Sequence, residues 1–180
     1  VRFRFPRDRR RFIACHAALR EILSACLDLP VSEICFIANP YGKPALERGA
    51  LHFNLSHAHE LALIAVAERE VGVDLEYLDA AREDIARSCC TPRELATVTA
   101  LPAGALAYWT CKEAYLKARG TGFAISPDQI QVDPPPMPLT RTGVIGDPTW
   151  SIHPFTPTSG YCAAVAARGD WLVDCRDWPA

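Results

Sequence analysis

Residues 71–76 place two acidic side chains in a segment whose other residues are apolar or glycine. The segment reads Val-Gly-Val-Asp-Leu-Glu, with the acids at Asp74 and Glu76. Because side chains alternate across a strand, both carboxylates share one face. Two neighbouring carboxylates on a buried strand repel each other and lose hydration, so a cation should compensate them. The alternative is a strand that runs out to solvent, where both acids are hydrated.

The composition indicates a globular protein of one ordinary domain or two small ones. The chain has 180 residues, 49% apolar and 22% charged, with a net charge of −2. This charge gives no reason to expect nucleic acid or an anionic membrane as partner. The apolar runs at 61–67 and 161–167 are too short to cross a bilayer, and the first residues lack the apolar core of a signal peptide. We therefore predict a cytoplasmic protein.

Eight cysteines lie mostly inside apolar segments. This placement predicts reduced, buried thiols rather than a secreted disulfide framework. The chain has no Cys-x-x-Cys pair, which argues against structural zinc. His52, His57 and His59 are the remaining candidates for a histidine-based metal site, but they have neither matching cysteines nor a spaced helical pair.

Apolar residues near helical spacing predict an amphipathic helix over 7–28, ended by Pro30. Six arginines lie around its start: Arg2, Arg4, Arg7, Arg9, Arg10 and Arg11. Such a cluster is either a solvated basic helix start or a site for a polyanionic ligand such as a phosphorylated nucleotide. The dipole at a helix start favours anions, so a bound phosphate would relieve the clustered charge.

Three strands are predicted between this helix and the acidic pair. Residues 34–38 form the first, followed by the turn 39–44, which holds Lys43 between glycine and proline. Residues 51–57 alternate as a strand and end in small polar groups. Residues 61–67 are almost continuously apolar, which is typical of a fully buried strand.

Helices are predicted after residue 76. The first covers 82–90, and a capping box from Thr91 to Glu94 starts the second. The third covers 104–119, where Glu113 and Lys117 fall on one stripe and Lys112 flanks it. Most other positions of this helix are apolar, so its charged groups need partners. A structural ion pair between Glu113 and Lys117 is the alternative to a functional site.

Strands are also predicted at 149–155, 161–167 and 171–175. The stretch 61–75 aligns without gaps with 161–175, an offset of 100 residues. This similarity predicts an α+β fold of two related halves, each a small, mainly antiparallel sheet packed with helices. The halves would cover 1–70 and 71–180. The acidic pair occurs in one copy only, so one active site is expected at the junction.

Four ordered motifs resemble those of the 4′-phosphopantetheinyl transferases of the larger, two-halved type that activates surfactin synthetase. They are Gly42-Lys43-Pro44, the Phe-Asn-Leu-Ser-His run at 53–57, the acidic strand at 71–76, and the Trp-x-x-Lys-Glu-Ala run from 109 that continues to Lys117, Gly120 and Gly122. The resemblance spans residues 42–122. It implies transfer of the phosphopantetheine arm of coenzyme A to a serine of an apo acyl- or peptidyl-carrier protein, with release of 3′,5′-ADP.

The resemblance also implies roles for individual residues. Metal ligands for Mg²⁺, or alternatively Mn²⁺, would be Asp74, Glu76 and Glu113. Contacts to coenzyme A would come from Arg11, Gly42, Lys43, Pro44, Ser56, His57, Lys112 and Lys117. Lys117 would meet the pyrophosphate leaving group. Magnesium suits such a displacement because it is a hard cation that binds carboxylates together with phosphate oxygens.

Several alternatives remain open at this level. The base that takes the serine proton is Glu113, a metal-held water or Glu94, whose other role is to cap its own helix. A magnesium-dependent pyrophosphate hydrolase and a catalytically silent binder of coenzyme A or carrier protein are the rival functions. The carrier should dock on the helices between residues 82 and 101, near Arg87 and Arg93. Two covalently joined halves predict a monomer.

Overall fold

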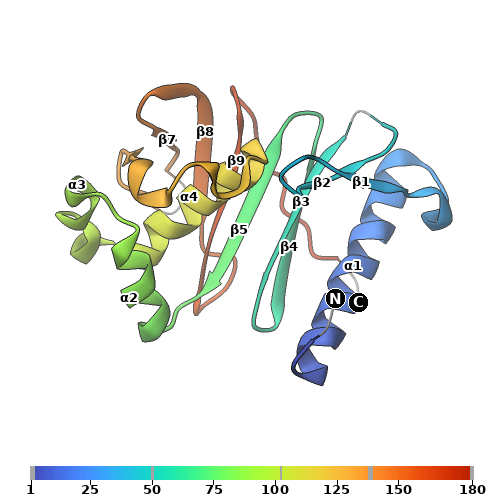
Figure 1. Cartoon of the computed structure of the whole chain (residues 1–180), viewed down its shortest axis with the longest axis horizontal. Coiled ribbons are helices and arrows are strands. Elements are labelled where there is room, and N and C mark those ends of the chain that lie inside the picture. The colour runs from blue at the N-terminus through green and yellow to red at the C-terminus, as the bar shows by residue number, and fades with distance from the viewer. Residues whose placement is uncertain (1–2, 50, 102, 138–139, 179–180) are drawn as a thin grey trace.

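A computed structural model describes residues 3–49, 51–101, 103–137 and 140–178. Arg2 of the arginine cluster lies outside these residues. Within them, short antiparallel sheets pack with helices, so the predicted α+β class is confirmed (Figure 1). Across this part of the chain no helix combines the length and apolar character that membrane crossing requires.

The first helix, α1 (Pro6–Leu27), leads into two hairpins that form separate two-stranded sheets. The first hairpin pairs β1 (Phe36–Ala38) with β2 (Pro44–Leu46), and the second pairs β3 (His52–Ala58) with β4 (Leu61–Ala67). Helix α1 packs on the second hairpin through Leu19 and Leu23. β4 is half-buried along its whole length, which differs from the full burial predicted from its apolar run. In the described part of the chain β4 pairs with β3 alone, so its other edge has no neighbouring strand.

The larger sheet has the strand order β5-β9-β8-β7-β6 and is antiparallel throughout. Its strands are β5 (Val71–Tyr77), β6 (Val132–Asp133), β7 (Thr142–Val144), β8 (Asp147–Phe155) and β9 (Tyr161–Arg168). Helix α4 (Ala105–Arg119) packs across this sheet and forms the main hydrophobic core with it (Figure 1). Helices α2 (Ala80–Ser88) and α3 (Pro92–Leu95) lie at the far end from α1.

Gly72 permits the closest approach between β5 and α4. A Cβ atom built at this position would lie 2.1 Å from the carbonyl oxygen of Ala114 and 2.3 Å from the backbone nitrogen of Ala118. These distances are far below van der Waals contact, so only glycine fits between strand and helix. The glycine therefore sets how near α4 lies to the acids on β5.

The strand predicted at 171–175 is wrong, because these residues have no regular structure. Leu172 is 96% exposed there. The apolar residues of this segment have strand propensity. A strand also needs a partner for its backbone hydrogen bonds, and this segment pairs with none in the described part of the chain. β4 and β9 do fall at equivalent places in the internal repeat, whereas β5 has no strand as its counterpart.

Candidate active site at the junction of beta5, alpha4 and the N-terminal hairpins

Side chains of β3 hydrogen-bond to the backbone of β5 and so join the smaller sheet to the larger one. Asn54 Oδ1 accepts a hydrogen bond from Val73 N at 2.9 Å, and Ser56 Oγ accepts one from Leu75 N at 3.2 Å. Both side chains are buried. They satisfy backbone donors that the edge strand β5 would otherwise leave unpaired. Sequence reasoning gave Asn54 no role, although it lies within the motif at 53–57.

The acids of β5 are buried, as the strand pattern predicted. Asp74 is 3% exposed and Glu76 is 7% exposed. Asp74 Oδ1 accepts hydrogen bonds from Lys117 Nζ at 2.5 Å and from Ser56 Oγ at 3.1 Å. Glu76 Oε1 accepts one from Trp109 Nε1 at 3.0 Å. The alternative of two hydrated acids at a strand end is therefore wrong.

Two buried carboxylate oxygens in this site have no hydrogen-bond partner among the residues that the structure describes. They are Asp74 Oδ2 and Glu113 Oε1, contributed by β5 and α4. Burial raises the pKa of Glu113 from its ordinary value of 4.5 to about 6. The negative charge of Asp74 adds to this rise, and Lys117 opposes it. A buried carboxylate without a partner is costly, so this place suits an added cation or a proton.

Lys117 forms its ion pair with Asp74 across to β5. Lys117 therefore pairs with an acid on the strand and not, as in the alternative considered from the sequence, with Glu113 on its own helix. Lys117 Nζ also lies 3.2 Å from Ser56 Oγ, so three of the predicted site residues meet at one point. The side chain of Lys117 is 30% exposed. Its ammonium therefore links the buried acid to the open side of the site.

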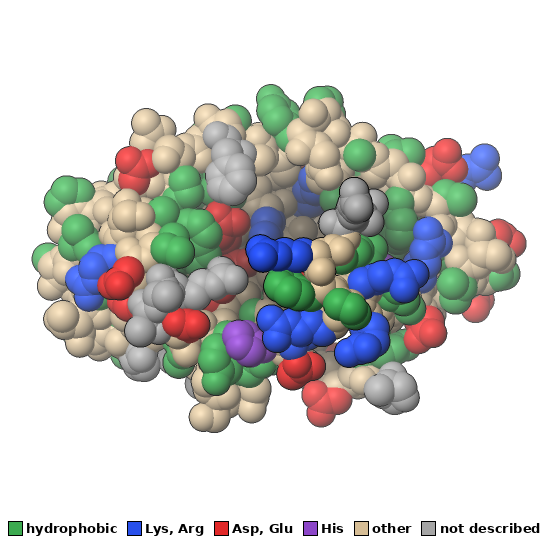
Figure 2. Space-filling view, turned by 60° about the horizontal axis from the view of Figure 1, so that its bottom comes forward, with side chains coloured by type: hydrophobic (Ala, Val, Ile, Leu, Met, Phe, Trp, Pro, Cys, Tyr) green, Lys and Arg blue, Asp and Glu red, His purple; other side chains and the backbone are tan. Residues whose placement is uncertain are grey.

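A pocket of about 390 Å³ opens beside this cluster. It is lined by Tyr41, Gly42, Lys43, Pro44, Asn54, Glu113, Leu116, Lys117, Gly120 and Gly122. Five of these residues were predicted to be in the site. Figure 2 shows a hollow near the middle of one face, with Lys and Arg side chains at its rim and more of them toward the side where α1 lies. Such a surface favours an anionic ligand.

The turn that holds Lys43 is fixed against the end of α4. Asn39 Oδ1 accepts hydrogen bonds from the backbone nitrogens of Tyr41 and Lys43, and its amide donates to Gly120 O at 2.7 Å. Lys43 Nζ donates to Val71 O at 3.1 Å and Ala118 O at 2.8 Å. Desolvation lowers the pKa of Lys43 to about 8. The turn at 39–44 was predicted from its sequence, but the contact of Asn39 with Gly120 was not.

Other predicted site residues lie apart from this cluster. Arg11 pairs with Glu60 in the β3–β4 turn and also lies 3.9 Å from Asp8, and it does not line the pocket. His57 is exposed on the face of β3 opposite to Ser56.

Lys112 and Glu94 are directed away from the acids of β5. Lys112 is fully buried and pairs with Glu94 at 2.6 Å, so its ammonium is not directed at the pocket. Glu94 forms the predicted capping box with Thr91. It also accepts a hydrogen bond from Val132 N at 2.8 Å. Both oxygens of the Glu94 carboxylate therefore hold neighbouring structural elements together.

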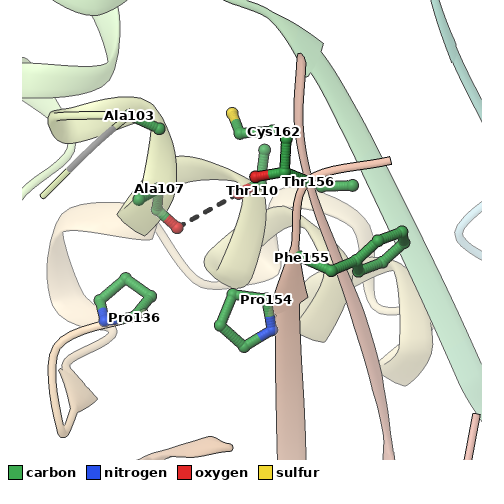
Figure 3. A pocket seen from close by; sticks show the side chains of 9 residues that line it. Ala103, Ala107, Thr110, Pro136, Pro154, Phe155, Thr156 and Cys162 are labelled. Carbon is green, nitrogen blue, oxygen red and sulfur yellow. Dashed lines mark hydrogen bonds between the residues drawn. The ribbon is translucent and has the colours of Figure 1, made fainter. Parts of the chain in front are cut away.

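A second crevice lies between α4 and the ends of β8 and β9 (Figure 3). Its volume is about 30 Å³, room for about one water molecule. Its lining is mostly apolar, and Thr110 Oγ1 already donates to Leu106 O and Ala107 O. It therefore offers no chemistry comparable to that of the larger pocket.

No group of three or more His, Cys, Asp or Glu side chains in the described ranges is gathered closely enough to hold a metal ion. The donor set nevertheless fits a hard cation, because carboxylate oxygens are the ligands that Mg²⁺ prefers. Two such oxygens, from Asp74 and Glu113, are buried without partners.

Comparison with known families assigns this architecture to a class of transferases. Residues 70–166 match the 4′-phosphopantetheinyl transferase superfamily, and residues 1–69 match the family described as 4′-phosphopantetheinyl transferase, N-terminal. The first match alone covers more than half of the chain. The chain therefore belongs to the 4′-phosphopantetheinyl transferase superfamily, and the family predicted from the four motifs is confirmed.

Individual relatives agree with this assignment. The 4′-phosphopantetheinyl transferase HetI of Nostoc sp. is 40% identical over 182 residues, which cover 93% of this chain and 75% of that protein. The transferase gsp of Aneurinibacillus migulanus is 29% identical, over 74% of this chain and 58% of its own length. Sfp of Bacillus subtilis is 26% identical, over 73% and 61%. The chain thus spans less than two thirds of the length of the last two relatives.

Proposed function

We propose that this chain transfers the 4′-phosphopantetheine group of coenzyme A to a serine of an apo acyl- or peptidyl-carrier protein, releasing 3′,5′-ADP. The observation that carries the proposal is the meeting of Asp74, Glu113 and Lys117 beside the pocket. Membership of the superfamily supports it. A pyrophosphate substrate needs its oxygens neutralised and its attacking and leaving groups aligned, and this cluster supplies groups for both tasks.

We propose that the pocket binds the nucleotide part of coenzyme A. Gly42, Lys43 and Pro44 would form the wall on the adenine side, since the turn that carries them is fixed against the end of α4. Ser56 and Lys117 would face the phosphates. Arg11 and His57 remain candidate phosphate contacts, although neither residue lines the pocket. Lys112 is left out of this set because its ammonium is buried against Glu94.

We propose that Asp74 and Glu113, together with Glu76, hold Mg²⁺ or Mn²⁺. When bound, this cation would neutralise phosphate oxygens of the substrate. The two unpartnered carboxylate oxygens support this assignment. Glu76 is oriented by Trp109, whose indole nitrogen donates to it.

Glu113 is the proposed base for the serine hydroxyl. Its side chain lines the pocket, and its Oε1 atom has no hydrogen-bond partner among the described residues. Lys117 would then move its charge toward the pyrophosphate, because its side chain is partly exposed and borders the pocket. Glu94 is not proposed for this role, since its oxygens already accept hydrogen bonds from Thr91, Lys112 and Val132.

We propose that the carrier protein docks on α2 and α3. These helices expose Ile85 and Leu95, and Arg87 and Arg93 lie beside them. Acidic carrier helices with a few apolar anchors would complement this surface. We also propose that the two halves divide near residue 70, and that the protein is a cytoplasmic monomer. Light scattering after size exclusion tests the oligomeric state.

The transfer is tested by the intact mass of an apo carrier protein after incubation with this chain, coenzyme A and Mg²⁺. A gain of one phosphopantetheinyl group is the expected result. Cleavage of coenzyme A without any gain would favour a pyrophosphate hydrolase. Binding of coenzyme A without cleavage or gain, with several carrier types, would favour a silent binding protein.

A further inference from the structure

Helix α4 presents a second polar face besides the one that carries Glu113. Successive residues turn by about 100°, so Tyr108, Lys112 and Tyr115 lie roughly 100° to 160° around the helix from Glu113. Tyr108 OH lies 2.7 Å from Thr97 Oγ1. Tyr115 OH donates to Asp147 Oδ2 at 2.7 Å. Polar contacts at three positions along this second face, Tyr108, Lys112 and Tyr115, therefore connect α4 to the surrounding elements.

The middle contact is a fully buried ion pair. Lys112 Nζ lies 2.6 Å from Glu94 Oε2, and the two side chains are 0% and 1% exposed. Lys112 Nζ also donates to Cys89 O at 2.7 Å. Glu94 accepts hydrogen bonds from Thr91 N and Val132 N, both at 2.8 Å. The pair thus connects α4 with the segment after α2, the start of α3 and the start of β6.

A buried ion pair tolerates little movement. Each charge is stable there only while its partner stays within hydrogen-bonding distance, because separation leaves an uncompensated charge in a medium of low dielectric constant. Rotation of α4 about its axis would pull Lys112 away from Glu94 and Cys89 O. The pair therefore holds one rotational setting of the helix. In that setting Lys117, one turn from Glu113 on the same stripe, pairs with Asp74, and Glu113 lines the pocket.

We propose that Glu94 and Lys112 are positioning residues, which act on the reaction by fixing the rotation of α4 and hence the place of the Glu113 carboxylate. This inference rests on the proposed function. It replaces the coenzyme A contact that the family resemblance implied for Lys112. The pair does not touch substrate, so its loss should change the chemical step and spare coenzyme A binding.

The test is the double variant E94Q/K112M in the full chain. It removes both charges together, so no unpaired charge stays buried, and the side-chain volumes change little. We expect its thermal unfolding midpoint to stay near that of the wild type. We expect kcat to fall at least about tenfold, with KM for coenzyme A within about twofold of wild type. Affinity for Mn²⁺ alone, measured by titration, should also weaken severalfold because Glu113 is displaced.

The exposed pair formed by Arg176 and Asp174 provides a matched control. Its side chains are 83% and 70% exposed. The variant R176M/D174N makes the same kinds of change there and should leave kcat, KM and Mn²⁺ affinity unchanged. A second double variant, E94Q/K112Q, also leaves no buried charge unpaired, and it decides the question if E94Q/K112M does not fold. It should lower kcat and Mn²⁺ affinity in the same direction.

Either double variant, if folded and with wild-type kcat and Mn²⁺ affinity, would overturn the positioning role. An increase in KM for coenzyme A at constant kcat would overturn it in favour of direct contact between Lys112 and the substrate. Failure of the wild type to modify any carrier would contradict the proposed function alone. The Mn²⁺ titration would then still report on the pair.

Discussion

Lys117 on α4 reaches Asp74 on β5, with 2.5 Å between Nζ and Oδ1. The contact joins the helix to the strand at the point where β3 contributes Ser56. It leaves Asp74 Oδ2 and Glu113 Oε1 buried without partners. The third carboxylate is that of Glu76, whose negative charge helps to raise the pKa of Glu113. One lysine charge therefore lies near three carboxylates. The excess of negative charge in the site favours the binding of a further cation.

Asp74→Asn removes a negative charge and keeps the size of the side chain. We expect kcat to fall at least about 100-fold, because the variant loses both the proposed cation ligand and the partner of Lys117. The fold should persist, since the amide oxygen still accepts from Ser56. Transfer rates and thermal unfolding measure the two effects. Asp174→Asn, at an exposed ion pair, is the matched control and should be silent. Wild-type turnover of D74N would remove Asp74 from the site.

The raised pKa of Glu113 predicts that the stability of the metal-free protein depends on pH. Its pKa is raised from 4.5 to about 6 in the folded state, so the folded protein binds the proton more tightly than the unfolded chain. The contribution of Glu113 to stability is therefore present below pH 4.5 and is lost as the pH rises through about 6.

Urea unfolding of wild type and E113Q from pH 4 to pH 7, with chelator present, measures this effect. The variant should gain stability relative to wild type as the pH rises through this window, because it has no proton to lose. Added Mg²⁺ should narrow the difference by stabilising the ionised carboxylate of the wild type. A difference that does not vary with pH would contradict the raised pKa.

Gly72→Ala should destabilise the fold severely. The new Cβ would meet backbone atoms of Ala114 and Ala118 at 2.1 and 2.3 Å, and backbone cannot rotate out of the way as a side chain can. We expect a loss of about 3 kcal/mol or more in the free energy of unfolding. Gly143→Ala in β7 is the control, since its nearest atom is Trp150 O at 3.6 Å. Equal stability of the two variants would contradict the close packing of α4 on β5.

Reversing charge on α2 and α3 tests the docking surface. Arg87→Glu with Arg93→Glu should raise KM for the carrier protein about tenfold and leave the dissociation constant of coenzyme A unchanged. Arg176→Glu, at an exposed place outside these helices, controls for the change in net charge. Equal loss of both affinities would show that the two arginines act on the site itself and not on the carrier.

Much of the site follows from local sequence pattern. The alternation in 71–76 predicted one buried face for Asp74 and Glu76, and the helical stripe predicted that Glu113 and Lys117 lie together. The capping box at Thr91 was likewise confirmed. These features depend on residues near each other in the chain, because the periodicity of strands and helices and the preferences at helix starts are local properties.

The partners of charged groups did not follow from the pattern. A helical wheel places Lys112 beside the stripe, but only the tertiary fold brings Glu94 to it. Lys117 similarly has one candidate acid on its own helix and another on β5, and the fold selects β5. The strand predicted at 171–175 failed for a related reason, since strand formation depends on a distant partner.

The most direct test of the account is a time course of carrier-protein intact mass with wild type and D74N, each with Mg²⁺ and with chelator. We predict a gain of one phosphopantetheinyl group with wild type and Mg²⁺. Chelator should block this gain, and D74N should reduce it at least about 100-fold. Equal transfer in all four reactions would contradict a cation-dependent site built on Asp74.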